Sequence, residues 1–155
     1  MSKIGRGFQV GLSWIHAEGG HVPPKAIDAG GGVYVGRMHH AGDLIPGKVI
    51  PRFGHAYCSH AGQEHTHSSY EVLCDTCAPS TRHCYRWEYA SGGHVPKSAI
   101  VAGLADNGSP LYIARVEING ERVVGKVHDG HPCAYFPYGG EEHRMPDYEV
   151  LVLEK

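Results

Sequence analysis

The chain contains one unit written twice, and this internal duplication constrains the fold more than any other feature. Segments 14–30 and 87–103 share 11 identities in 17 positions. Segments 34–73 and 112–151, offset by a further five residues, agree at 15 of 40 positions. A unit too small to bury a core alone is expected to pack against its copy. We therefore expect two homologous repeats, 1–73 and 87–155, packed with pseudo-twofold symmetry and joined by a linker over 74–86.

The local signals within each repeat are those of β-strands. Asn119-Gly120 lies between two apolar runs and is typical of a type I′ hairpin turn, because both central residues need a positive φ. Ala41-Gly42 occupies the same place in the first repeat. Pro46-Gly47 predicts a type II turn or a bulge. No window of helical length carries an apolar stripe of period 3.6, so the sequence predicts an all-β fold of antiparallel strands.

Composition and charge argue against several classes of protein. The net charge is −2 with no basic block, so we expect no nucleic-acid partner. No apolar stretch is long enough for a transmembrane helix, and segment 1–10 lacks the apolar run of a signal peptide. The five cysteines are an odd number, which favours reduced thiols. We therefore expect a cytoplasmic protein, with non-classical export left open.

A longer pattern recurs in both repeats and covers residues 14–151. It reads Trp…Gly-x-Val-Pro…Ala-Ile…Gly…Tyr-x-x-Arg…Gly-Lys…Gly-x-Glu-His…Tyr-Glu-Val-Leu. This pattern resembles the DM-nine repeat, and seven or more anchored positions in each copy make the match specific. Members with two tandem repeats include mannose-binding lectins of oyster, all-β proteins that dimerise, and invertebrate relatives are associated with responses to microbes. The resemblance implies a homodimeric lectin that binds mannose-containing glycans in innate immune recognition.

The resemblance also implies a set of sugar-binding residues. In the lectin branch, binding is attributed to a turn aspartate, an acid after the hairpin glycine, and the lysine of the Gly-Lys pair. These match Asp106, Glu121 and Lys126 in the second repeat. The first repeat keeps Asp43 and Lys48 but has glycines in place of the turn aspartate. Its site is therefore expected to be degraded, or completed from the other repeat.

The chemistry of these residues fits a sugar ligand. Sugar hydroxyls both donate and accept hydrogen bonds, and a carboxylate with a lysine satisfies both; such charged hydrogen bonds contribute about 1.5–3 kcal/mol each. In both repeats the acid precedes the lysine by five residues, and an odd spacing places side chains on opposite faces of a regular strand. We expect a bulge at Gly47 or Gly125 to bring the pair together. The alternative is a solvated ion pair that contributes little.

Other residues recur in both repeats and are interpreted mainly as structural. We expect the glutamate of each Glu-His pair to cap turn amides, with acid–base chemistry as the alternative. The strand arginine of each repeat is expected to pair with a carboxylate, and the leading tryptophan to anchor the core. One tyrosine in each repeat is a candidate for stacking on a sugar. These residues are Glu64, His65, Glu142, His143, Arg37, Arg115, Glu71, Glu149, Trp14, Trp87, Tyr57 and Tyr135.

The predicted linker contains a possible metal site. Cys74, Cys77, His83 and Cys84 follow the spacing Cys-x2-Cys-x5-His-Cys, and three thiolates with one imidazole can close a tetrahedral zinc site. The alternative is a set of reduced thiols. Histidines between residues 39 and 67 are also numerous enough to collect metal.

The motifs of common catalytic sites are absent. The chain has no Gly-x-Ser-x-Gly and no P-loop, so we expect neither an enzyme nor a bound cofactor. Two further functions remain open beside the lectin. One is an intracellular protein-interaction or vesicle-associated module that does not bind sugar, and the other is a metal-stabilised scaffold.

Overall fold

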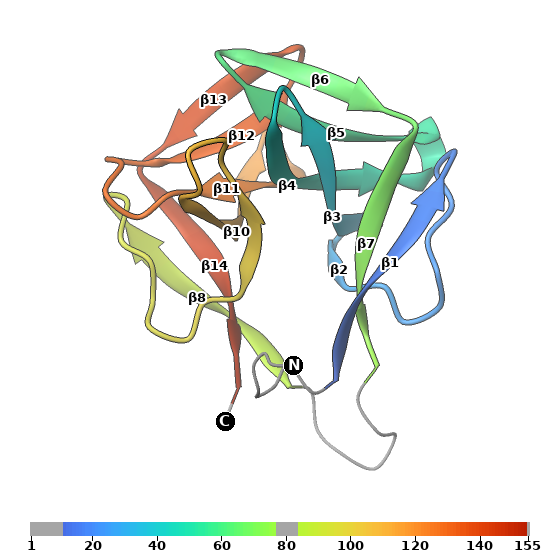
Figure 1. Ribbon diagram of the computed structural model, residues 1–155, viewed down its shortest axis with the longest axis horizontal. Helices are drawn as coiled ribbons and strands as arrows, with labels where there is room; N and C mark the ends of the chain where they lie inside the picture. The colour runs from blue at the N-terminus through green and yellow to red at the C-terminus, as the bar shows by residue number, and fades with distance from the viewer. Residues whose placement is uncertain (1–10, 77–83, 155) are drawn as a thin grey trace.

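The computed structural model describes residues 11–76 and 84–154, and Figure 1 shows their arrangement. Within these residues it contains β-strands, one 3-10 turn and no α-helix. The first repeat forms β1 (Leu12–Glu18), β2 (Asp28–Gly30), β3 (Val33–His40), β4 (Asp43–Ile50), the 3-10 turn η1 (Pro51–Phe53), β5 (His55–His60), β6 (Gln63–His67) and β7 (Ser69–Asp75). The second forms β8 (Tyr85–Ser91), β9 (Val101–Leu104), β10 (Pro110–Ile118), β11 (Glu121–Val127), β12 (Ala134–Tyr138), β13 (Glu141–Met145) and β14 (Asp147–Leu153).

The strand order confirms two antiparallel repeats related by pseudo-twofold symmetry. The main path runs β1-β7-β3-β4-β5-β6 and continues β13-β12-β11-β10-β14-β8, so the second half reverses the order of equivalent strands in the first. The repeats join where β6 meets β13, through Glu64 N–H to Gly140 O at 3.1 Å and Glu142 N–H to Gly62 O at 3.0 Å. In Figure 1 these strands lie at the top, while β1, β7, β8 and β14 lie on the two sides and extend toward the bottom of the view.

The predicted hairpin turns are confirmed in both repeats. Asn119 and Gly120 connect β10 to β11 with φ values of 51° and 80°. Ala41 and Gly42 connect β3 to β4 with φ values of 51° and 86°, although alanine is strained in this region. The first turn therefore has the same geometry with weaker turn chemistry.

The turn or bulge predicted at Pro46-Gly47 is wrong. Both residues lie inside β4, and the pairing of β3 with β4 continues through them without a shift of register. The glycine serves a close approach between strands: a Cβ at Gly47 would lie 2.1 Å from the carbonyl oxygen of Tyr57. A Cβ at Gly125 would likewise lie 2.1 Å from the carbonyl oxygen of Tyr135. A side chain at either position would therefore push neighbouring strands apart.

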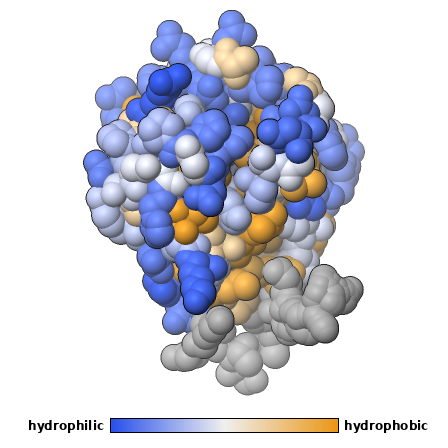
Figure 2. Space-filling model, turned by 60° about the vertical axis from the view of Figure 1, so that its left-hand side comes forward, coloured by the Kyte–Doolittle hydropathy of each residue, from blue (hydrophilic) through white to orange (hydrophobic). Residues whose placement is uncertain are grey.

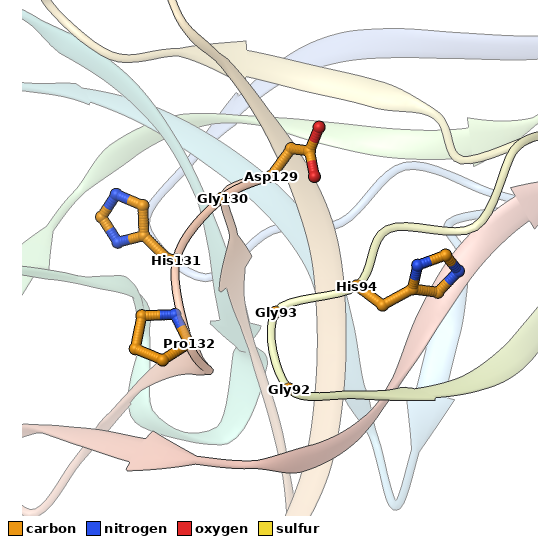
Figure 3. Close-up of a pocket in the computed structure, with 7 residues that line it drawn as sticks. All are labelled: Gly92, Gly93, His94, Asp129, Gly130, His131 and Pro132. Atoms are coloured by element: carbon orange, nitrogen blue, oxygen red, sulfur yellow. The ribbon is translucent and has the colours of Figure 1, made fainter.

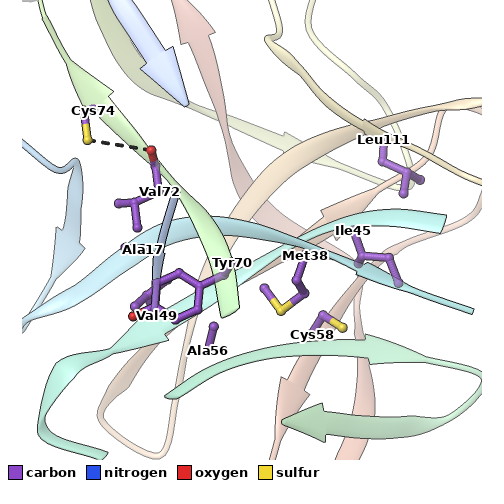
Figure 4. Packing of buried hydrophobic residues seen from close by; sticks show 10 residues of the cluster. All are labelled: Ala17, Met38, Ile45, Val49, Ala56, Cys58, Tyr70, Val72, Cys74 and Leu111. Atoms are coloured by element: carbon purple, nitrogen blue, oxygen red, sulfur yellow. Dashed lines mark hydrogen bonds between the residues drawn. The ribbon is translucent and has the colours of Figure 1, made fainter. Parts of the chain in front are cut away.

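The hydrophobic core consists of three clusters, and the middle one draws residues from both repeats. It includes Val35 and Leu73 from the first repeat and Ile113 and Leu151 from the second. Trp14 and Trp87 pack against this cluster, together with three other partly buried hydrophobic residues. The two tryptophans are therefore confirmed as core anchors. The other two clusters lie mainly within single repeats, and Figure 4 shows the one in the first repeat.

The strand arginines make the predicted ion pairs and also tie the repeats together. Arg37 Nε and Arg115 Nε lie 2.7 Å from carboxylate oxygens of Glu71 and Glu149, respectively. Each guanidinium also lies about 4 Å above a tryptophan ring, at 4.2 Å in the first repeat and 4.3 Å in the second. Arg37 donates to the carbonyl of Ala102 at 3.0 Å, while the second arginine reaches the equivalent carbonyl in the first repeat at 3.1 Å. Both contacts cross between repeats.

The surface in Figure 2 is largely hydrophilic in its upper part, and hydrophobic residues gather in the lower part. Across the described residues, no helix is long and apolar enough to span a membrane. The predicted linker, 74–86, overlaps the ends of two strands, since β7 ends at Asp75 and β8 begins at Tyr85.

Candidate ligand sites between the repeats

The two predicted lysines are buried and ion-paired. Lys48 is 5% exposed and its Nζ lies 3.2 Å from Glu64 Oε2. Lys126 is 6% exposed and its Nζ lies 3.3 Å from Glu142 Oε2. The charge partner of each lysine is therefore the glutamate of the Glu-His pair in its own repeat.

The acid predicted to accompany each lysine lies instead beside the lysine of the other repeat. Glu121 lines the same hollow as Lys48. Burial lowers the pKa of that lysine, and the charges of Glu64 and Glu121 offset only part of this effect. Asp43 lies on the side of Lys126: its Oδ2 is 3.8 Å from Nε2 of His60, and Lys126 Nζ donates to the carbonyl of the adjacent Ser59 at 2.7 Å. The β10–β11 and β3–β4 ladders are regular, so the predicted bulge is absent and the odd spacing keeps acid and lysine of one strand apart.

Each glutamate of the Glu-His pairs caps a turn amide, as predicted, but the turn belongs to the other repeat. Glu64 Oε1 accepts from Gly140 N–H at 2.8 Å, and Glu142 Oε1 accepts from Gly62 N–H at 2.9 Å. Burial acts to raise the pKa of Glu142, but Lys126 and the hydrogen bonds outweigh it, so the pKa is lowered. One carboxylate thus neutralises a buried lysine and links the two repeats.

The first of the two sites, here the Lys48 site, is an open hollow with charged and aromatic walls. Its volume is about 210 Å³. The Nζ of Lys48 lies 5.4 Å from the ring centroids of both Tyr57 and Tyr138. Phe53 at the rim is 54% exposed. The lining residues are Lys48, Ile50, Phe53, Tyr57, Glu64, Glu121, Tyr138 and Gly139. This combination can bind a ligand that has both hydroxyls and an apolar face.

The pseudo-symmetric counterpart, here the Lys126 site, has the same charged framework, namely a buried lysine paired with a glutamate, and it is lined by histidines. At the offset of 78 residues its positions are Asp43, His60, Lys126, His128, His131, Tyr135 and Glu142. Lys126 also donates to Ser59 O at 2.7 Å. The ring of His128 stacks on that of His131 at 4.2 Å between centroids. Burial, helped by His131 and Lys126, lowers the pKa of His128 to about 4.

The turn aspartate of the prediction belongs to the Lys126 site. The N–H of Asp106 donates to Asp43 Oδ1 at 2.9 Å, and His60 Nε2 lies 3.8 Å from Asp43 Oδ2. Of the five residues predicted to bind sugar, Asp43, Asp106 and Lys126 therefore gather on one side. Lys48 and Glu121 gather on the other. The sequence indicated His60 only among the histidines that could collect metal, and His128 and His131 were missed because no sequence pattern relates residues 60, 128 and 131.

Another hollow, of about 410 Å³, lies between two loops of the second repeat. Figure 3 shows its lining, in which the imidazoles of His94 and His131 point in opposite directions. Gly93 forms the wall where the loops come closest, since an added Cβ would collide with the carbonyl oxygen of His131. The labelled side chains do not converge on a common point, so we assign no ligand to this hollow.

Of the four linker residues predicted to bind zinc, the structure describes Cys74 and Cys84. Cys74 is buried in β7, and its Sγ lies 3.6 Å from Val72 O (Figure 4). Cys77 and His83 lie outside the described residues. Another group of metal-ligating side chains, which includes His40, Cys58 and His67, lies together in the first repeat.

Two natterins are similar to this chain in sequence. The chain is 27% identical over 143 residues to natterin-4 of Thalassophryne nattereri, a match covering 90% of this chain and 33% of natterin-4. It is 34% identical over 67 residues to natterin-3 of the same organism, covering 43% of this chain and 16% of natterin-3. The chain thus spans about a third or less of these relatives.

A solved structure supports the fold and a family model supports the ancestry. The nematode sperm cell motility protein MFP2B superposes with a TM-score of 0.66 at 17% identity, covering 97% of this chain and 48% of that one. At this identity the match concerns the fold alone. The model of the DM9 repeat matches residues 28–145, which include most of both repeats. The chain therefore belongs to the DM9 repeat family.

Proposed function

We propose that the protein is a carbohydrate-binding protein rather than an enzyme, and that the Lys48 site binds mannose-type glycans. The observation that carries the proposal is the composition of this hollow: one lysine and two carboxylates beside three aromatic rings. Membership of the DM9 repeat family supports a lectin of this kind.

The groups of the Lys48 site match the chemistry of a sugar. Glu121 is exposed on the hollow and offers acceptors for hydroxyl groups, while the ammonium of Lys48 offers donors. The exposed ring of Phe53 and the ring of Tyr138 offer apolar faces for the C–H side of a pyranose. Because acid and lysine come from different repeats, one repeat alone lacks a complete site. Charged hydrogen bonds contribute about 1.5–3 kcal/mol before solvent screening, so a monosaccharide is expected to bind weakly.

Weak sites become effective when they are repeated. The homodimer that we propose would carry two copies of the Lys48 site. Several weak sites that engage one surface together raise avidity without new contacts. A repetitive glycan surface, such as that of a microbe, is therefore the ligand that we propose in an innate immune role.

The proposal is tested with a glycan array of the purified chain, with soluble mannose as competitor. We expect binding to mannose-containing glycans that mannose inhibits. Phe53→Ala should weaken it up to about tenfold, the equivalent of about 0.5–1.5 kcal/mol for a lost ring contact. Glu121→Gln, which keeps the shape and removes the charge, should weaken it several-fold.

The matched control is His131→Ala, because His131 occupies the position equivalent to Phe53 and is also exposed. We expect it to leave binding at the Lys48 site unchanged. A blank array from folded protein would contradict the proposal and favour an interaction module without sugar binding. Equal losses in Phe53→Ala and His131→Ala would contradict the choice of the Lys48 site.

A further inference from the structure

Nitrogen and sulfur ligands gather where β3, β5 and β6 lie together in the first repeat. His40 Nδ1 lies 3.1 Å from His67 Nε2. The Sγ of Cys58 completes a group whose ligand atoms all lie within 4.8 Å of one another. Cys58 is fully buried in the first core cluster, where Figure 4 shows it beside Met38, and both histidines are partly exposed. The group therefore has a buried base and an opening toward the surface.

The equivalent positions of the second repeat show that the fold does not need these ligands. At an offset of 78 residues, Ile118, Phe136 and Met145 stand where the first repeat has His40, Cys58 and His67. The strand pairing around the two sets is equivalent, since β5 pairs with β6 as β12 pairs with β13. The same backbone arrangement thus accommodates three apolar side chains. The polar set of the first repeat calls for another explanation.

Two neighbouring histidines already have partners that explain them. His65 Nε2 lies 3.2 Å from His60 O, and the equivalent His143 Nε2 lies 3.0 Å from Tyr138 O, so this contact is part of the shared fold. His60 Nε2 is directed to Asp43 at 3.8 Å. An alternative ligand group of His40, His60 and His65 would disrupt these contacts. This leaves His40, Cys58 and His67 as the group whose side-chain types do not recur in the second repeat.

We propose that His40, Cys58 and His67 bind a first-row transition metal ion of the Zn²⁺ class, with the fourth position open to water. Two imidazoles and one thiolate are ligands that such ions prefer. Zn–N bonds of about 2.0–2.1 Å place the nitrogens of a tetrahedral site about 3.3 Å apart. This is close to the 3.1 Å between His40 Nδ1 and His67 Nε2. On binding, the Cys58 thiol loses its proton to solvent as the metal–sulfur bond forms.

The electrostatics of the group agree with this geometry. Burial, together with the neighbouring imidazoles of His65, His67 and His60, lowers the pKa of His40, and burial together with His65 lowers that of His67. A lowered pKa favours the neutral imidazole, which is the form that binds metal. Burial raises the pKa of Cys58 to about 12, so its thiolate forms only when a cation is bound.

The proposal is tested by titrating the full chain, after removal of metals by a chelator, with Co²⁺ as a spectroscopic probe and Zn²⁺ as competitor. We expect one Co²⁺ per chain, a thiolate charge-transfer band in the near ultraviolet, and displacement by Zn²⁺. The variants His40→Ile and His67→Met introduce the residues of the second repeat. Each should lower the affinity at least about tenfold. Cys58→Ser should abolish the charge-transfer band.

The matched control is His60→Tyr, which also introduces the residue of the second repeat and should leave the affinity within about twofold. Circular dichroism and thermal unfolding of each variant without metal verify that it folds. An unchanged band in folded His67→Met, or a loss in His60→Tyr as large as in His67→Met, would overturn the proposal. A band that survives Cys58→Ser and disappears in Cys77→Ser would place the metal on the linker cysteines and would also overturn it.

Discussion

The Lys48 site and the Lys126 site share one framework and differ in their linings. In each, a buried lysine pairs with a glutamate that also accepts a turn N–H of the other repeat. Around this framework, Ile50, Phe53 and Tyr138 of one site are replaced by His128, His131 and His60 of the other. Buried charges must be paired, so neither member of a lysine–glutamate pair can change alone without loss of stability. The lining carries no such constraint, so ligand preference can change there.

The metal-ligating group extends the same contrast. The first repeat has His40, Cys58 and His67 where the second has apolar side chains. Both versions are compatible with the strands around them. Because the chain is duplicated, the equivalent residue of the other repeat shows which side chains the fold accepts at each of these positions.

The largest expected effect tests whether the two charged frameworks are equivalent. We expect Glu64→Ala and Glu142→Ala each to lower the free energy of unfolding by about 3–5 kcal/mol, because a buried lysine loses its partner. Each change also removes the acceptor for a glycine N–H of the other repeat. Urea unfolding measures both losses.

The control for this comparison removes the whole pair. Lys126→Met/Glu142→Leu should recover much of the stability lost in Glu142→Ala, since no unpaired charge remains. Losses in Glu64→Ala and Glu142→Ala that differ by more than about 2 kcal/mol would show that the two frameworks are not equivalent.

An intermediate effect concerns acid sensitivity, which the histidine lining should confine to the Lys126 site. Burial and neighbouring cations lower the pKa of His128 from 6.5 to about 4, so the unfolded chain binds its proton more readily. The stability from this group is therefore complete above about pH 6.5 and is lost as the pH falls to about 4. Because the ring is partly exposed, we expect a loss of about 1 kcal/mol rather than the full value of the shift.

The measurement compares urea unfolding at pH 7 and pH 4 in the wild type and in His128→Ile, which introduces the residue of the Lys48 site. The variant should lose less stability on acidification by about 1 kcal/mol. Identical losses in both proteins would mean that His128 does not contribute to acid sensitivity.

The smallest expected effect concerns the hairpin turns. Ala41 adopts a φ of 51° at the position where the second repeat has Asn119 with the same φ. Asparagine tolerates this conformation better than alanine. Ala41→Asn should therefore stabilise the protein by about 0.5–1 kcal/mol, and Asn119→Ala should destabilise it by a similar amount. Thermal unfolding that moves in the same direction for both variants would contradict this.

The repeat organisation and much of the fold could be predicted because their signals are local or duplicated. Asn119-Gly120 specifies a turn through its own backbone preferences, and the same turn recurs at Ala41-Gly42. The pairing of Arg37 with Glu71 was predicted because both residues recur in the second repeat at the same separation. Gly47 was misjudged, because its close neighbour Tyr57 belongs to another strand and the local sequence suggested a turn.

The sequence by itself determined the duplication, the antiparallel strands and the residues that carry charge at the candidate sites. Only the tertiary structure decided which acid meets which lysine. The pairing of β6 with β13 joins the repeats so that Glu121 lies beside Lys48, while Asp43 lies on the side of Lys126. The same holds for the metal-ligating group, whose members come from three strands. Contacts between strands depend on how the whole sheet closes, and no local pattern encodes that closure.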